Sequence, residues 1–297
     1  MEKARVYFTK NIDSQEVVRL YEKLGINLPG KVAIKVHSGE VGNQNFLHPI
    51  YFKPIVDHLN GTIVECNTAY QGERNTSEKH KKTFEKHGWY QYFDVDLMDE
   101  EEDKDIVLDI PDGIVIKKDY VGSHLANYDS VLVVSHFKGH PMGGFGGALK
   151  QLSIGFASSR GKAYIHSGGK TLDQSILWEN LAGQDHFLEA MADAASAVTK
   201  RFKGKIAFIS AMVNLSVDCD CCSVAEDPCM KDIGILASTD PIALDKACMD
   251  LIKKSKDRGR DHFLARVNRQ NGEHIFEAAI NRNFGTIDYE LIDITDK

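Results

Sequence analysis

The residues best suited to chemistry are the cysteines, four of which lie within the eleven residues from Cys219 to Cys229. Thiolates are soft ligands that bind zinc, copper(I) and iron–sulfur clusters. Alternate side chains of an extended chain share a face, so Cys219 and Cys221 point together, and Cys222 joins them only if the chain turns there. The predicted metal ligands are Cys219, Cys221, Cys222 and Cys229. The predicted cofactor is an iron–sulfur cluster or another thiolate-bound metal ion. The spacing does not identify the metal, because it matches neither a zinc ribbon nor the usual ferredoxin pattern.

Two other interpretations of the cysteines remain open. The thiols could pack as small hydrophobic side chains, or two of them could form a redox-active pair. Four thiols so close together are hard to explain by packing, and a secreted disulfide framework would occupy a shorter chain more densely. We therefore favour a metal ion or cluster over both alternatives.

A glycine-rich stretch is the second unusual feature, because residues 139–169 hold nine of the 24 glycines. It follows the buried-type strand 130–135 and enters a helix near Gly146. Open α/β sheets bind ligands beyond the carboxyl ends of their strands, and glycines let backbone N–H groups at a helix start approach an anion. A tight structural turn is the alternative. The residues predicted to bind a small anionic ligand or cofactor are Lys138, Gly143, Gly144, Gly146, Gly147 and Lys150.

Three histidines accompany this stretch: His136, His140 and His166. An unperturbed histidine has a pKa of about 6.5, which suits proton transfer near neutral pH. We predict them as catalytic acid/base groups, and His136 or His140 could also complete a metal site. The alternative is that each is a hydrogen-bonded structural side chain.

Predicted strands and helices alternate along the chain, which is typical of an α/β fold. Nearly continuous apolar or β-rich runs predict strands over residues 31–37, 130–135 and 205–215. We predict a mixed or mostly parallel sheet layered with helices, in one lobe or two. No linker divides residues 1–297, so we predict a single continuous unit. The acidic segment 94–105 is predicted to be a solvated loop, and 106–116 a hairpin around Pro111. Asp240 and Pro241 predict the start of a helix through N-capping.

Composition excludes several classes of protein. The 36 basic and 43 acidic side chains give a net charge of −7, which argues against a nucleic-acid partner. No apolar run approaches the roughly 20 residues of a membrane span, and the first residues lack an apolar signal core. We therefore expect a cytoplasmic protein with no membrane partner.

Several blocks of sequence, taken together, resemble a known family. They are Ser135-His-Phe-Lys-Gly-His140, Gly144-Phe-Gly-Gly-Ala-Leu-Lys150, His166-Ser167, Asp218-Cys-Asp-Cys221, Asp232-Ile-Gly-Ile-Leu-Ala-Ser238 and Asp240-Pro-Ile-Ala243. Over about residues 31–252 the chain resembles the iron–sulfur-associated "domain of unknown function 362". Many relatives carry a ferredoxin-like insertion after the equivalent of His166-Ser167. Residues 168–180 contain no cysteine, so the resemblance implies a member that lacks this insertion and its clusters.

Three functions are compatible with these observations. The first is a metal- or iron–sulfur-binding protein of redox type, which would need a redox partner protein. The second is an enzyme that acts on a small anionic substrate by racemase-like or other acid/base chemistry at the glycine-rich stretch. The third is a scaffold protein with a structural metal, whose removal would unfold the chain. We favour the first and leave open whether the protein is an enzyme.

Overall fold

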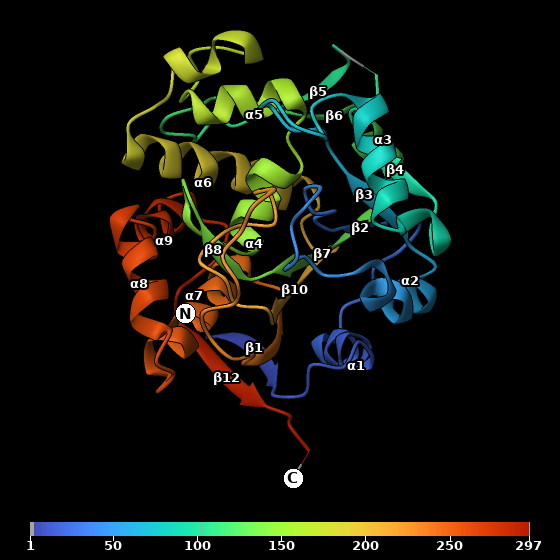
Figure 1. The fold of residues 1–297 in the computed structure, drawn as a ribbon, viewed down its shortest axis with the longest axis vertical. Helices are drawn as coiled ribbons and strands as arrows, with labels where there is room; N and C mark the ends of the chain where they lie inside the picture. Colours follow the sequence, from blue (N-terminus) through green and yellow to red (C-terminus); the bar gives the residue numbers. More distant parts are fainter. Residues whose placement is uncertain (1–2, 102, 297) are drawn as a thin grey trace.

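An eight-stranded sheet forms the centre of the computed structural model, which describes residues 3–101 and 103–296 (Figure 1). The strand order is β12-β1-β11-β10-β7-β2-β3-β4. In this sheet β11 runs antiparallel to β1 and β10, and the other neighbouring pairs are parallel. The strands are β1 (Ala4–Thr9), β2 (Val32–Lys35), β3 (Thr62–Glu65), β4 (Val95–Leu97), β7 (Ser130–His136), β10 (Ile206–Met212), β11 (Gly234–Ser238) and β12 (Tyr289–Asp293). The predicted α/β class with a mostly parallel sheet is confirmed.

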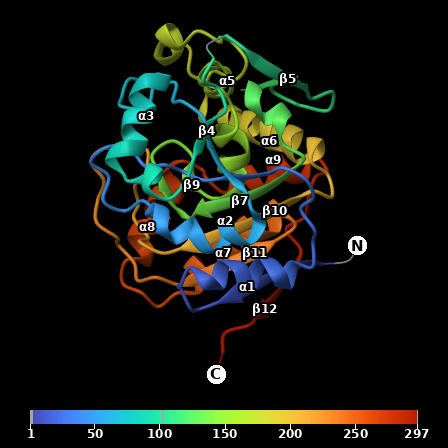
Figure 2. The ribbon, with the colours of Figure 1, turned by 90° about the vertical axis from the view of Figure 1, so that its right-hand side faces the viewer.

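Helices cover both faces of the sheet, and Figure 2 shows α1 and α2 lying in front of the strands. The helices are α1 (Gln15–Leu24), α2 (Lys53–Leu59), α3 (Ser77–Lys86), α4 (Ala148–Lys150), α5 (Ser159–His166), α6 (Gln184–Arg201), α7 (Pro241–Lys254), α8 (Arg260–Arg269) and α9 (His274–Ile280). Shorter helical segments are η1 (Pro49–Phe52), η2 (Trp89–Gln91), η3 (Ser123–Asn127), the π-helical η4 (Gln151–Gly155) and η5 (Gln174–Glu179). None of the described helices has the length and apolar character required to cross a membrane.

The central strands separate two hydrophobic cores because successive side chains point to opposite faces. In β10, Ile206 and Phe208 belong to the core beneath α6 and α7, while Ala207 and Ile209 belong to the core beneath α1 and α2. Every residue of β7 and β10 is buried. This two-sided burial explains the nearly continuous apolar runs that made both segments recognisable as strands.

Two hairpins lie outside the central sheet. One pairs β5 (Asp105–Asp109) with β6 (Lys118–Gly122), so its second strand begins later than the predicted hairpin 106–116 allowed. The other pairs β8 (Lys138–His140) with β9 (Gly144–Gly146), and it occupies the glycine-rich stretch.

The prediction of a solvated loop over residues 94–105 is wrong in part. The short strand β4 lies inside this segment and pairs with β3 at the edge of the sheet. An edge strand pairs on one side alone, so it tolerates the acidic side chains that suggested a loop.

A buried ion pair ties α6 to the segment after α9. Asp193 lies on α6, and its carboxylate accepts hydrogen bonds from the backbone N–H groups of Ile114, Val115 and Ile116. Arg282 Nε lies 2.6 Å from the same carboxylate, and the two side chains are 1% and 0% exposed. Removing one member of a buried pair leaves the other charge without compensation.

We expect Arg282→Met to lower the free energy of unfolding by about 3–5 kcal/mol, because Asp193 would remain buried and unpaired. The measurement is urea denaturation followed by circular dichroism. The matched control is Lys200→Met, because Lys200 pairs with Asp112 at side-chain exposures of 39% and 50%. An exposed pair of this kind contributes about 0–1 kcal/mol. Equal effects of the two substitutions would contradict the expectation.

Candidate metal centre and the adjoining cavity

The cysteine cluster lies where two central parallel strands end side by side. β7 and β10 pair in parallel, with His136 opposite Ala211. The chain segments that leave these strands are therefore neighbours at the same edge of the sheet. Cys219 and Cys221 lie in the segment after β10, and the chain turns there because the N–H of Cys222 donates to the carbonyl of Cys219 at 2.9 Å.

Asp220 anchors this turn from the side opposite the thiols. Its carboxylate accepts hydrogen bonds from His136 Nδ1 at 2.9 and 3.0 Å and contacts Lys138 Nζ at 2.9 Å. Burial opposes ionisation, but the charges of His136 and Lys138 hold the pKa of Asp220 well below its usual range. His136 Nε2 lies 2.6 Å from the carbonyl of Val213. Both ring nitrogens of His136 thus face acceptors, which leaves no nitrogen free for a metal or substrate.

Two thiols and one imidazole meet on the other side of the turn. Ligand atoms of His140, Cys219 and Cys221 all lie within 4.8 Å of one another, so the group could hold a metal ion. Cys221 Sγ is 3.7 Å from His140 Nε2, and the N–H of Cys221 donates to Cys219 Sγ at 3.4 Å. Lys150 Nζ lies 4.0 Å from Cys219 Sγ. The sulfur of Cys219 therefore receives several donors in a buried position.

The tautomer of His140 follows from its backbone contacts. The N–H of Gly143 donates to His140 Nδ1 at 2.8 Å, and that of Met142 donates at 3.2 Å. A backbone N–H can only donate, so the neutral ring carries its proton on Nε2, the nitrogen that faces the thiols. Burial lowers the pKa of His140 to about 4, which keeps the ring neutral at pH 7. His140 is therefore oriented as an N–H···S donor.

His37, which the sequence analysis missed, repeats this arrangement. Its Nδ1 accepts the N–H of Gly39 at 3.0 Å, and its ring hydrogen-bonds to Cys219. Burial and the charge of Arg74 lower the pKa of His37 to about 4. The available signal was position alone, because His37 closes the predicted strand 31–37 whose neighbour in the sheet is β7.

The three neighbouring thiols influence one another's ionisation. A hydrogen bond with Cys219 lowers the pKa of Cys221, but a hydrogen bond with Cys222 and burial outweigh it and raise that pKa to about 11. The pKa of Cys222 is lowered, chiefly by its hydrogen bond with Cys221. Coupled groups lose their protons one after another, so the first thiolate opposes the formation of the next. A divalent cation would remove this repulsion, because cysteines bind metals as thiolates.

The remaining cysteines lie apart from this group. The thiol of Cys229 donates to the carbonyl of Leu215 at 3.3 Å, and the charges that affect its pKa come from Glu226 and Asp257. Cys66 donates to the carbonyl of Phe156, and Cys248 is buried on α7. Of the four predicted ligands, the structure brings together Cys219 and Cys221, with Cys222 beside them and Cys229 elsewhere.

The start of the helix in the glycine-rich stretch already binds a carboxyl group from the chain itself. The N–H groups of Ala148 and Leu149 donate to the carboxylate of Asp245 at 2.8 and 2.9 Å. A Cβ on Gly147 would lie 2.3 Å from that carboxylate, so glycine is required for this close approach.

The predicted anion-binding residues consequently do not form one site. Gly146 and Gly147, with Lys138, line a void of about 10 Å³, which is close to the size of one water molecule. Gly144 has φ +79° and packs against Gly272. Lys150 alone of the predicted set faces the larger cavity described next.

A cavity of about 500 Å³ adjoins the thiols. Its charged, polar and sulfur-containing lining residues are His37, Glu65, Cys66, Thr68, Tyr70, Gln71, Arg74, His140, Lys150, Gln151, Lys162, His166, Cys221 and Cys222. His166 Nδ1 donates to the carbonyl of Lys162 at 2.7 Å, which leaves Nε2 as an acceptor. Burial lowers the pKa of His166 to about 4. The cavity thus brings the predicted residues His140 and His166 together, while His136 faces Asp220.

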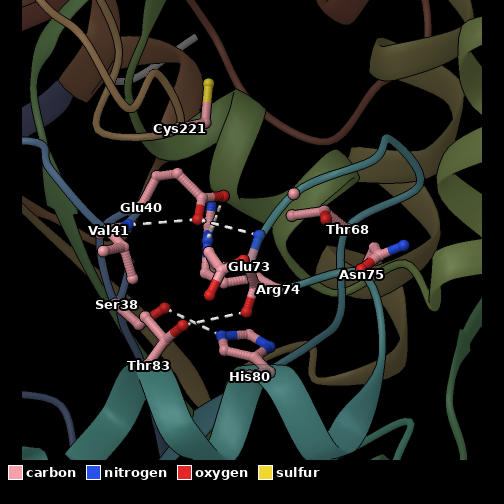
Figure 3. A network of polar contacts seen from close by, with 12 residues as sticks. Ser38, Glu40, Val41, Thr68, Glu73, Arg74, Asn75, His80, Thr83 and Cys221 are labelled. Atoms are coloured by element: carbon pink, nitrogen blue, oxygen red, sulfur yellow. Dashed lines mark hydrogen bonds and ion pairs between the residues drawn. The ribbon is translucent and has the colours of Figure 1, made fainter. Parts of the chain in front are cut away.

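A buried polar network forms one wall of this cavity (Figure 3). Arg74 Nε lies 3.2 Å from the carboxylate of Glu40, and both side chains are at least nine-tenths buried. Arg74 also donates to the hydroxyl of Tyr70 at 2.9 Å, and Tyr70 donates to the carbonyl of Cys221 at 3.0 Å. The N–H of Glu40 donates to the carbonyl of Asp220. The cysteine turn is therefore held by loops that follow β2 and β3 as well as by β7.

Comparisons with known proteins identify the family. The family model described as "Domain of unknown function (DUF362)" matches residues 32–250, so the chain belongs to this family. No curated protein matches the sequence. Among solved structures, the chain is similar to the lactate racemase apoprotein from Thermoanaerobacterium thermosaccharolyticum at 13% identity and TM-score 0.46, covering 99% of this chain and 84% of that chain. It is also similar to a protein from Thermotoga maritima at 10% identity and TM-score 0.41, covering 90% and 58%.

The depressed pKa of His166 predicts a loss of stability in acid. Its folded-state pKa of about 4 lies below the unfolded value of about 6.5, so the unfolded chain binds more protons between these limits. The stabilisation is present above pH 6.5 and is lost as the pH falls toward 4. We expect His166→Gln to reduce the loss of unfolding free energy between pH 7 and 5 by up to about 2 kcal/mol.

Urea denaturation at both pH values measures this difference. The control is His262→Gln, because the side chain of His262 is 54% exposed. An unchanged pH dependence in His166→Gln would mean that another group causes the acid sensitivity.

Proposed function

We propose that this member of the DUF362 family binds a soft metal ion through the thiolates of Cys219 and Cys221, for redox-type chemistry in the adjoining cavity. The observation that carries the proposal is the convergence of two thiols and His140 Nε2 within 4.8 Å. Soft metal ions prefer sulfur ligands, and a cation would relieve the repulsion between neighbouring thiolates. Cys222 is a third donor, because it hydrogen-bonds to Cys221 and lines the same cavity.

The donor set fits a single metal ion better than a four-iron cluster. Such a cluster takes four cysteine thiolates, whereas three of the six cysteines lie near one another here. Cys66 and Cys229 donate to backbone carbonyls elsewhere, and Cys248 is buried on α7. We therefore derive no electron-transfer step through a four-cysteine cluster. When bound, the metal ion would supply a Lewis-acidic or redox-active centre at the cavity wall.

The two neutral histidines support the thiolates. His37 and His140 each accept a backbone N–H at Nδ1, so each presents Nε2–H toward sulfur. Hydrogen bonds to ligating sulfur tune metal affinity and redox potential. Direct ligation by His140 Nε2 would require a proton on Nδ1, where the N–H of Gly143 already points. We therefore assign His140 as a positioning donor to sulfur.

A Co²⁺ titration tests the metal site, because thiolate ligation gives an intense near-ultraviolet absorption band. We expect anaerobically purified protein to bind one equivalent. Substitution of a residue that hydrogen-bonds to a metal ligand typically costs about 10–100-fold in metal affinity. Cys219→Ser and Cys221→Ser each remove a ligand, so each should weaken Co²⁺ binding by more than that. Cys229→Ser is the matched control and should leave the titration unchanged.

The same titration distinguishes the alternatives. A protein that neither contains metal after purification nor binds Co²⁺ contradicts the proposal and favours a redox-active thiol pair, for which Lys150 beside Cys219 would stabilise the thiolate. A protein that unfolds when a chelator removes the metal favours a structural site.

The role of His140 has its own test. A glutamine amide can donate to sulfur from about the same position as Nε2–H, whereas alanine cannot. We expect His140→Gln to keep Co²⁺ affinity within about tenfold and His140→Ala to lose about 10–100-fold. The affinities come from competition with a chelating dye. If both variants lose Co²⁺ affinity equally, and by more than about 10–100-fold, His140 is a direct ligand.

A further inference from the structure

Lys162 is a buried ammonium group that lacks an anionic partner. It lies on α5, its side chain lines the cavity, and the residue is 6% exposed. Its Nζ donates to the carbonyl of Ala157 at 2.6 Å. Within residues 3–101 and 103–296, no carboxylate oxygen lies within 4.0 Å of this nitrogen. A buried charge is costly unless it is paired, so the site favours an anion supplied from outside the chain.

The buried acidic side chains around Lys162 have other partners or are opposed in their ionisation by burial. Glu65 pairs with Lys35 at 2.5 Å. Asp99 accepts the N–H groups of Asn67 and Ser159, and burial raises its pKa. Burial also raises the pKa of Asp119 well above its usual value. The charge of Lys162 opposes the rise in the pKa of Asp99 and Asp119, but neither carboxyl group places an oxygen within 4.0 Å of Lys162 Nζ.

The other basic residues of the cavity are accounted for. Arg74 pairs with Glu40, and Lys150 lies beside the thiol of Cys219. His140 and His166 are neutral at pH 7, since the pKa of each is lowered to about 4. His37 is also neutral at pH 7, because its pKa is lowered to about 4. Lys162 is thus the ammonium group of the cavity that has neither a carboxylate nor a thiol beside it, and it offers one position for a negative group on a ligand.

The rest of the lining suits an apolar ligand body. Apart from the indole N–H of Trp178, the remaining side chains carry no charge or strong hydrogen-bonding group: Ala69, Pro141, Met142, Ile154, Leu177 and Trp178. Trp178 lies on η5 and is 57% exposed, so its ring is accessible from solvent as well as from the cavity. A volume of about 500 Å³ lies within the usual range for small-molecule sites.

We infer that this cavity binds an organic monoanion, with its negative group at the ammonium of Lys162 and its apolar body against Leu177 and Trp178. The site differs from the predicted anion site at the helix start, where Asp245 already occupies the N–H groups. The inference does not depend on metal binding, because Lys162 and the apolar lining are separate from the thiols that would hold the ion.

The probe for the test is 8-anilinonaphthalene-1-sulfonate, an aromatic monoanion that fluoresces in apolar sites. N-phenyl-1-naphthylamine is its neutral counterpart. We expect Lys162→Met to weaken binding of the sulfonate at least about tenfold, which corresponds to about 1.4 kcal/mol, and to leave the neutral probe unchanged. The matched control, Lys200→Met, should alter neither, because Lys200 is exposed and pairs with Asp112.

Two further variants locate the probe and separate this inference from the metal proposal. Trp178→Phe keeps an aromatic ring but should abolish most energy transfer from tryptophan to the bound sulfonate. This variant also covers the case in which Lys162→Met fails to fold. A Cys219→Ser/Cys221→Ser double variant should still bind the sulfonate even though it loses Co²⁺. Unchanged sulfonate affinity in folded Lys162→Met, or unchanged energy transfer in Trp178→Phe, would overturn the inference.

Discussion

The candidate site depends on the burial of one carboxylate. Asp220 lies between Cys219 and Cys221, and its contacts with His136 and Lys138 hold it against the ends of β7 and β8. Because adjacent side chains diverge, an inward Asp220 turns both neighbouring thiols toward the opposite side. All three side chains are at least nine-tenths buried, so losing one would leave the others without a buried polar partner. The contacts of Asp220 thus determine the direction in which both thiols point.

Around the thiols, the fold keeps the imidazoles neutral and places two lysine side chains. Burial lowers the pKa of His37, His140 and His166 to about 4, and backbone N–H groups determine which nitrogen of His37 and His140 carries the proton. Lys150 faces the thiols, while Lys162 faces the cavity. The same cavity therefore has sulfur ligands at one end and the side chain of Lys162, on α5, in another part of its wall. A metal ion and an organic anion could occupy it together without competing for the same residues.

The α/β architecture could be predicted because its signals are local. Continuous apolar runs identified β7 and β10, and Asp240 with Pro241 identified the start of α7, where the Asp240 carboxylate accepts the N–H groups of Ile242 and Ala243. Segments whose character depends on neighbours were predicted less well. The edge strand β4 carries acidic residues, and the glycine-rich stretch forms the β8–β9 hairpin. The high density of glycines correctly predicted that another group lies close to this backbone. At Gly147 that group is the side chain of Asp245, which is far away in the sequence, and not a ligand.

The sequence by itself determined which segments form buried strands and that Cys219 and Cys221 point to the same side. It also determined that residues 168–180 contain no cysteine. These properties follow from periodicity and spacing within a few residues of chain. Only the tertiary structure decided that His37 joins the thiols and that Cys229 does not. It also decided that Lys162 donates to a backbone carbonyl and has no carboxylate within 4.0 Å in the part of the chain that the structure describes. Each of these outcomes depends on contacts between segments far apart in the chain. Such contacts arise from strand order and helix packing, which no local pattern of residues specifies.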